Sequence, residues 1–115
     1  MDGDDGDPLG GRPAEPETAI VTMVFDTTDP DALLGALSKY VVLTRGEPGC
    51  RNVDLCGSST RPNRLVVVQK WVSEAVARAH FDSPLTVEMA TACDGILAAP
   101  PDIDILVGLS AHDWA

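Results

Sequence analysis

The sequence predicts a single α+β domain in which helices cover one side of an antiparallel sheet. Two runs, AIVTMVF at 19–25 and RLVVVQKWV at 64–72, are rich in β-branched and aromatic residues, which is typical of strands. The segments 30–45 and 84–94 instead repeat apolar residues at helical spacing. A chain of 115 residues is long enough for one two-layer core.

The first strand, Ala19–Phe25, is apolar except for Thr22, which suggests burial on both faces. Asp29 is a suitable N-cap and Pro30 suits the first helical position, so a helix is expected over about Pro30–Arg45. Gly46 is well placed to end it. One face of this helix carries Leu33, Leu37, Tyr40, Val41 and Thr44.

A hairpin follows, with strands Cys50–Ser58 and Arg64–Val72 joined by the polar turn SSTRPN. The second strand points one mostly apolar set of side chains to each face of the sheet. These sets are Leu65, Val67, Gln69 and Trp71, and Val66, Val68, Lys70 and Val72. Helices on one side leave the second apolar face needing cover, and a two-fold homodimer through this open face is the commonest way to supply it.

Ser73 caps a short helix, Glu74–Phe81, and Ser83-Pro84 opens a longer one, Pro84–Asp94, which Gly95 is expected to end. The longer segment places Leu85, Met89, Ala92, Cys93 and Ile96 at helical spacing. The last strand, Asp102–Leu109, alternates with Ile103, Ile105, Val107 and Leu109 inward. The order β-α-β-β-α-α-β is the ferredoxin-like split βαβ plan with its second helix broken in two.

Net charge and hydropathy argue against several classes of binding partner and cellular location. The net charge is −10, and the first 18 residues hold six acidic residues and one basic residue, so they contribute −5. Nucleic acids and anionic membranes are therefore not expected partners. We expect a disordered acidic tail over 1–18, a domain over 19–110 and a loosely held end over 111–115. The N-terminus does not resemble a signal peptide and no apolar run reaches the roughly 20 residues of a membrane span, so we expect a cytoplasmic protein.

Three cysteines suit a reducing compartment. Cys50 and Cys56 are about 20 Å apart at ~3.3 Å per strand residue, too far to pair with each other or to share a metal ion. No CxxC or HxxxH spacing occurs, so no metal site is expected.

The motifs EPGC, PNRLVVVQKW, SEAV, AHF and SP, in this order and spacing, resemble the antibiotic biosynthesis monooxygenase family over roughly Ala19–Leu109. The resemblance implies ferredoxin-like domains that pair as dimeric α+β barrels. It also implies oxidation of a quinol or of a polycyclic phenol or anthrone by O2, often with no metal or organic cofactor. Such a substrate can reduce O2 once deprotonated, so the site must hold the ring, exclude water and favour the anion.

The resemblance implies three catalytic candidates. His80, in AHF, can accept a phenolic proton near neutral pH. Trp71 matches the family's strand tryptophan and can stack on a ring or donate its indole N–H, although a core role is the safer interpretation. Thr22 is the nearest match to a family Asn on the first strand, although a β-branched residue also simply suits a strand. Tyr40, Gln69, Phe81, Leu85 and Met89 are expected to line the substrate cleft.

Two departures from the family pattern keep other functions open. Leu85 stands where many quinol-oxidising relatives have a second His in SPHF, and no His lies between Pro84 and Ile96 to bind haem iron. The alternatives are a non-catalytic dimer that binds a small apolar metabolite, or another dimeric-barrel enzyme such as an isomerase or a haem-handling protein.

Overall fold

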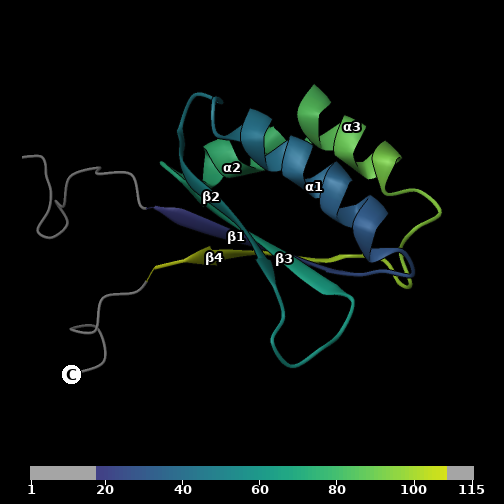
Figure 1. Ribbon diagram of the computed structural model, residues 1–115. Coiled ribbons are helices and arrows are strands. Elements are labelled where there is room, and N and C mark those ends of the chain that lie inside the picture. Colours follow the sequence, from purple (N-terminus) through teal and green to yellow (C-terminus); the bar gives the residue numbers. More distant parts are fainter. Residues whose placement is uncertain (1–17, 109–115) are drawn as a thin grey trace, which may run out of the picture.

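A computed structural model describes residues 18–108 and confirms the predicted order of elements (Figure 1). The tail predicted over 1–18 and the end predicted over 111–115 therefore lie, except for Thr18, outside the described residues, as does Leu109. The elements are β1 (Ala19–Asp26), α1 (Pro30–Thr44), β2 (Cys50–Gly57), β3 (Arg64–Trp71), α2 (Glu74–Phe81), α3 (Pro84–Ala92) and β4 (Asp102–Val107). Each predicted element is present, with ends within two residues of those expected.

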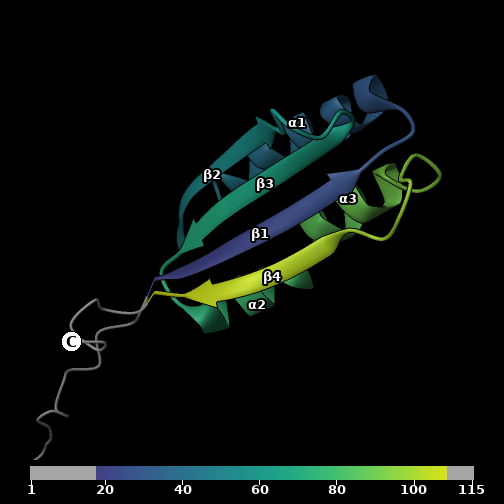
Figure 2. The same cartoon turned by 90° about the horizontal axis from the view of Figure 1, so that it is seen from below.

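The four strands form one antiparallel sheet in the order β2-β3-β1-β4. All three helices lie on the same side of this sheet, and its other side carries no helix (Figures 1 and 2). This is the predicted ferredoxin-like α+β fold with helices on one face. None of the helices described is both long and apolar enough to span a bilayer.

Strand alternation divides the residues of β1 between the two faces. Val21, Met23 and Phe25 are buried beneath the helices, whereas the residues between them are half-buried on the open face. The apolar run of β1 is thus buried on one face only within a single copy of the chain. The structure also confirms the division predicted for β3, in which Val67, Gln69 and Trp71 face the core.

The helices begin where the sequence predicts, because a side-chain oxygen caps each of them. The Asp29 carboxylate accepts from the amide of Ala32 at 3.2 Å. The hydroxyls of Ser73 and Ser83 accept from the amides three residues later, at 3.2 and 3.3 Å. These caps satisfy amides that the first helical turn leaves unpaired and so fix the start of each helix.

The segment between α3 and β4 folds back against the end of β1. Gly95 adopts a positive φ of 83°, which reverses the chain just after α3. The Ala98 amide donates to the Asp26 carbonyl at 2.8 Å, and the Thr28 amide donates to the Ile96 carbonyl at 3.1 Å. These bonds hold the segment away from α3 and leave space between them.

β4 lies at an edge of the sheet and is less buried than its sequence pattern suggests. Ile103, Ile105 and Val107 pair with Met23, Val21 and Ala19 and therefore face the helix side, as predicted. Ile103 and Val107 are nevertheless 44% and 40% exposed, because an edge strand has a neighbouring strand on one side only.

Candidate functional site

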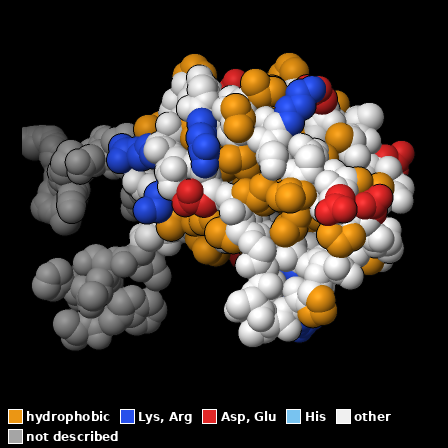
Figure 3. Space-filling model, in the orientation of Figure 1, with side chains coloured by type: hydrophobic (Ala, Val, Ile, Leu, Met, Phe, Trp, Pro, Cys, Tyr) orange, Lys and Arg blue, Asp and Glu red, His pale blue; other side chains and the backbone are white. Residues whose placement is uncertain are grey.

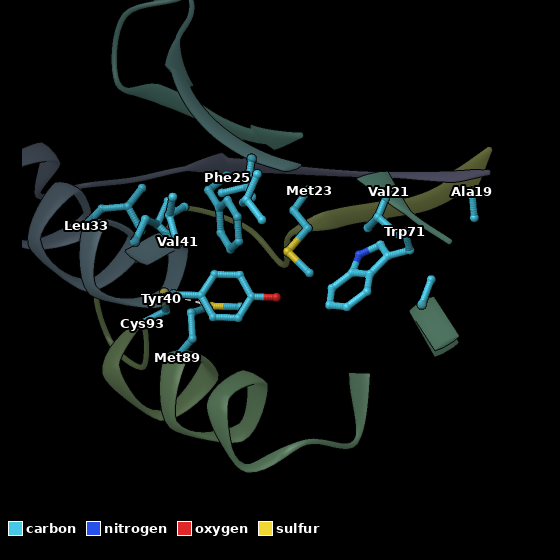
Figure 4. Close-up of a cluster of buried hydrophobic side chains, with 14 residues drawn as sticks. Ala19, Val21, Met23, Phe25, Leu33, Tyr40, Val41, Trp71, Met89 and Cys93 are labelled. Carbon is cyan, nitrogen blue, oxygen red and sulfur yellow. Dashed lines mark hydrogen bonds between the residues drawn. The ribbon is translucent and has the colours of Figure 1, made fainter. Parts of the chain in front are cut away.

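Four side chains with polar groups meet in the core between the sheet and the helices. Tyr40 comes from α1, Gln69 and Trp71 from β3, and His80 from α2. None is more than 3% exposed. In Figure 4 the hydroxyl of Tyr40 points toward Met23 and Trp71 in the middle of the apolar cluster. We call these four residues the core network.

Hydrogen bonds join the core network end to end. Trp71 Nε1 donates to Gln69 Oε1 at 2.8 Å, and Gln69 Nε2 donates to Tyr40 Oη at 2.8 Å. Tyr40 Oη lies 2.8 Å from His80 Nε2. Buried polar groups are costly unless they are paired, so these bonds allow an amide and an imidazole to occupy an apolar core.

His80 is held by an aromatic neighbour as well as by hydrogen bonds. Its ring centroid lies 4.6 Å from that of Trp71, with the two rings tilted by 36°. Its second ring nitrogen, Nδ1, lies 3.4 Å from the hydroxyl of Ser83. Thr86 donates its hydroxyl to the His80 carbonyl at 2.8 Å. The imidazole is therefore fixed from β3, α1 and the start of α3.

Burial keeps the two titratable members of the core network neutral. Desolvation lowers the pKa of His80 below its usual 6.5, against a weaker opposing effect of the negative charge on Glu47. Desolvation raises the pKa of Tyr40 above its usual 10.0, against weaker effects of the Thr86 hydroxyl and then of the Gln69 amide. At neutral pH the pair is thus an uncharged imidazole, able to accept a proton, beside an intact phenol.

A cavity of about 500 Å³ lies between α3, the segment that follows it, and the adjoining ends of β1 and β4. Its volume lies in the range of small-molecule sites. The lining residues are Phe25, Thr86, Met89, Ala90, Cys93, Asp94, Gly95, Leu97, Ala98, Ala99, Pro100, Pro101 and Ile103. Burial raises the pKa of the Cys93 thiol, so this cavity residue stays protonated at neutral pH.

Two cavity residues connect this space with the core network. Thr86 is hydrogen-bonded to the backbone of His80. Met89 lines both the cavity and a smaller groove of about 70 Å³ between α1 and α3, where Tyr40 and Leu85 are also lining residues. Figure 3 shows apolar side chains gathered over this side of the molecule, at the level between the helix layer and the sheet. Met89 is flexible and apolar, so it forms an adaptable wall between cavity and core network.

The structure brings together most of the residues predicted for the site. His80, Trp71, Tyr40 and Gln69 form the core network itself. Met89 lines the cavity and the groove, Leu85 lines the groove, and Phe81 is half-buried against the core.

Thr22 lies apart from the other predicted residues. It is half-buried on the open face, where it pairs with Val68 and Asp104 of the neighbouring strands. The reason is the two-residue period of a strand, because the flanking Val21 and Met23 both face the helices. The period of β1 could have given this placement from the sequence.

Other cavity residues were not predicted. Thr86 follows Pro84 in the first turn of α3, and its neighbours show no pattern that marks a site. Leu97 belongs to an irregular segment that hydropathy alone does not place. Phe25 was assigned to the first strand, and only the fold shows that it borders the cavity. Within residues 18–108 no three His, Cys, Asp or Glu side chains are grouped so that they could hold a metal ion.

Comparison with known proteins places this geometry in a family. The model of the antibiotic biosynthesis monooxygenase family matches residues 18–92, which is more than half of the chain. No curated protein gives a significant match.

Several solved structures share the fold. One described as a putative antibiotic biosynthesis monooxygenase from Nitrosomonas europaea aligns with a TM-score of 0.75 and 20% identity, covering 84% of this chain and 94% of that one. Rv0793 from Mycobacterium tuberculosis aligns at 0.72 with 27% identity, covering 81% and 96%. SnoaB, described as a cofactor-independent oxygenase from Streptomyces nogalater, aligns at 0.72 with 14% identity, covering 83% and 96%. The chain therefore belongs to the antibiotic biosynthesis monooxygenase family.

Proposed function

We propose that this protein is a cofactor-independent, monooxygenase-like enzyme that oxidises a quinol or a polycyclic phenol or anthrone with O2. The observation that carries the proposal is the neutral Tyr40–His80 pair, buried beside an apolar cavity large enough for a small ligand. Family membership, and the description of SnoaB as a cofactor-independent oxygenase, support the same chemistry.

The reaction of an anthrone needs no further reductant. The substrate loses a proton to the site, and its anion forms a C–O bond with O2 to give a hydroperoxide. Loss of the remaining C–H proton breaks the O–O bond, leaving a ketone and releasing water. The CH2 group supplies all four electrons that O2 takes up. A quinol would instead give a quinone and hydrogen peroxide, a two-electron exchange.

The protein's part in this scheme is to take up the first proton. His80 Nε2 is occupied by the Tyr40 hydroxyl, so a substrate hydroxyl reaches it through Tyr40. Tyr40 Oη accepts one hydrogen bond from Gln69 and has a second lone pair. A substrate hydroxyl in the cavity reaches it only if Met89 moves aside, because Tyr40 does not line the cavity. The substrate proton then moves to Tyr40 as the Tyr40 proton moves to His80. The cavity is mostly apolar but open to solvent, so a bound substrate would displace its water and thereby strengthen these contacts.

We also propose that two copies pair through their open sheet faces. The half-buried apolar residues on this face are Ile20, Val24, Val66 and Val68. Leu106, on the edge strand of the same face, is 43% exposed. A two-fold dimer would cover this surface and form the barrel that the family resemblance implies. The partners are thus a second copy of the chain, an aromatic substrate and O2.

Oxygen uptake with a panel of reduced naphthoquinols and anthrones tests the proposed reaction. We expect uptake well above autoxidation without protein. His80→Gln and Tyr40→Phe should each lower the rate at least tenfold, which corresponds to about 1.4 kcal/mol of barrier. Thr91→Val, which removes an exposed hydroxyl on α3, is the control and should keep the wild-type rate.

Two outcomes would contradict the reaction or its site. Uptake equal to autoxidation across the panel would favour a second candidate, a non-catalytic module that binds a small apolar metabolite. The burial of the core network, whose polar groups already pair with one another, favours this alternative. A rate lost in Thr22→Val but retained in Tyr40→Phe would move the site to the open face of the sheet.

A further inference from the structure

The direction of each hydrogen bond in the core network follows from its tryptophan. An indole nitrogen can only donate, so the Gln69 atom that faces Trp71 must be the amide oxygen. The amide nitrogen of Gln69 then faces Tyr40 and donates to its hydroxyl oxygen. Trp71 thereby determines that the amide nitrogen of Gln69, and not its oxygen, faces Tyr40.

This orientation decides where the Tyr40 proton lies. Gln69 presents a donor, so the hydroxyl hydrogen of Tyr40 cannot be used there. The hydroxyls of Thr86 and Thr44 lie near Tyr40, but within residues 18–108 the other atom in hydrogen-bond geometry with Tyr40 Oη is His80 Nε2, at 2.8 Å. Tyr40 must donate to it, and a nitrogen that accepts a hydrogen bond carries no proton. Neutral His80 therefore carries its proton on Nδ1, which faces the hydroxyl of Ser83.

We infer that Trp71, acting through Gln69, is a positioning residue that holds His80 in the Nδ1–H tautomer with Nε2 free of a proton and bonded to Tyr40. The tautomer follows from the hydrogen bonds alone. Its catalytic consequence rests on the proposed function, because only this tautomer can accept the Tyr40 proton when a substrate proton arrives. In the opposite tautomer Nε2 would already carry a proton and the relay would be blocked.

The surroundings of His80 favour the same state. Its neighbours are Tyr40 from α1, Trp71 from β3, and Ser83 and Thr86 at the start of α3, none of which is charged at neutral pH. Glu47, in the turn after α1, is the one charged residue whose field opposes the effect of burial. His80 is therefore neutral at neutral pH, and a neutral imidazole carries its one proton on either Nδ1 or Nε2.

Substitutions at Trp71 or Gln69 should remove the preference of His80 for the Nδ1–H tautomer. In Trp71→Phe no donor faces the Gln69 oxygen, so the amide can turn over and accept from Tyr40. Tyr40 is then free to accept a hydrogen bond from His80 Nε2–H. The end of the amide that faces residue 71 lacks a partner in either orientation, so nothing at that position favours one orientation over the other. Gln69→Glu in its ionised form does the same more strongly, because a carboxylate only accepts. Leu33→Val is the control, since it shrinks the buried core without touching the core network.

The measurement is the ¹⁵N signal of each imidazole nitrogen in the uniformly labelled full-length protein, recorded from neutral to alkaline pH. His112→Gln identifies the His80 signals, because the chain has two histidines. We expect an unprotonated Nε2 and a protonated Nδ1 in wild type and in Leu33→Val. Trp71→Phe should move the Nε2 signal toward the protonated position, and Gln69→Glu should move it further as its carboxyl ionises. Circular dichroism and thermal unfolding establish that each variant is folded.

The wild-type spectrum alone can overturn the inference, because a protonated Nε2 in the neutral ring would contradict the hydrogen-bond directions. Folded Trp71→Phe and Gln69→Glu proteins that both keep the wild-type tautomer would overturn the role of Trp71. Oxygen uptake separates this result from the proposed function. A wild-type protein with the expected tautomer and no uptake would retain the inference and remove the reaction. Oxygen uptake by a protein whose His80 Nε2 is protonated would support the reaction and overturn the inference about the tautomer.

Discussion

The two faces of the sheet use the same strands in opposite ways. On the helix side, Val67, Gln69 and Trp71 of β3 are at most 1% exposed, and the polar groups among them are paired within the chain. On the open side, Val66 and Val68 of the same strand are only half-buried. One face is thus complete in a single copy, and the other is an apolar surface that one copy leaves in contact with solvent.

Charge follows the same division. The neighbours of the apolar open-face residues include Asp54, Asp102 and Asp104, which are exposed, and the exposed Lys70. The helix-facing side of the sheet carries no charged residue within the described strands, and its polar members are an amide and an indole. An apolar centre with charged neighbours is typical of a protein interface, whereas a paired polar group inside a core is typical of a fixed site. The difference predicts which substitutions change assembly and which change the fold.

The largest expected effect is on assembly. Val68→Asp places a carboxylate in the middle of the open face, and a two-fold dimer would bury two of them together. If the proposed dimer forms, the dissociation constant should rise at least about 100-fold, or roughly 2.7 kcal/mol. Sedimentation equilibrium measures the change directly, and circular dichroism should show that the separated chain keeps its secondary structure.

Val67→Ala supplies the matched comparison one residue away. Val67 is fully buried beneath the helices, so the shorter side chain should cost about 2 kcal/mol of unfolding free energy through lost burial and a cavity. It should leave the dissociation constant within a few-fold of wild type. If Val67→Ala dissociates the protein and Val68→Asp leaves it paired, the faces have been assigned the wrong roles.

A smaller effect is expected at Thr44, the buried hydroxyl of α1 that lacks a partner. Its side chain is fully buried, and its Oγ1 has no hydrogen bond within the described residues. Thr44→Val has nearly the same shape and removes a desolvated polar atom, so the unfolding free energy should rise by about 1 kcal/mol. Chemical denaturation measures it.

Thr86→Val is the contrasting variant, because the Thr86 hydroxyl does have a partner. It donates to the His80 carbonyl at 2.8 Å, so its removal should lower the unfolding free energy by about 1 kcal/mol. Equal losses in the two threonine variants would mean that the Thr44 hydroxyl has a partner after all.

The fold was predictable from the sequence because local signals agree with one another. Asp29 and Pro30, Ser73, and Ser83 with Pro84 mark the helix starts, and the two-residue period of β3 gives its two faces. Family motifs led to His80 and Trp71, and helical or strand spacing led to Tyr40 and Gln69. The hydrogen bonds that join Tyr40 to Gln69 and to His80 could not be predicted, since they link residues 29 and 40 positions apart in sequence. The cavity depends on where the segment after α3 folds, which no periodic pattern encodes.

The last expected effect is the pH dependence that burial of His80 imposes. Its pKa in the folded protein lies below 6.5, so the unfolded chain binds the proton more readily. The resulting stability is fully present above about pH 6.5 and is lost as the pH falls through the lower, folded pKa. The unfolding free energy should therefore decline below pH 6.5 with a slope of at most about 1.4 kcal/mol per pH unit.

His80→Gln should flatten that decline, because the variant has no group at position 80 that titrates. Asp26 acts in a separate, more acidic window, since its hydrogen bonds with Arg64 hold the pKa of its carboxyl below 3.8. A parallel slope in wild type and His80→Gln would mean that His80 meets solvent in the folded protein. The helix-facing side of the sheet would then be open to solvent near His80, and the two faces of the sheet would not differ in burial there.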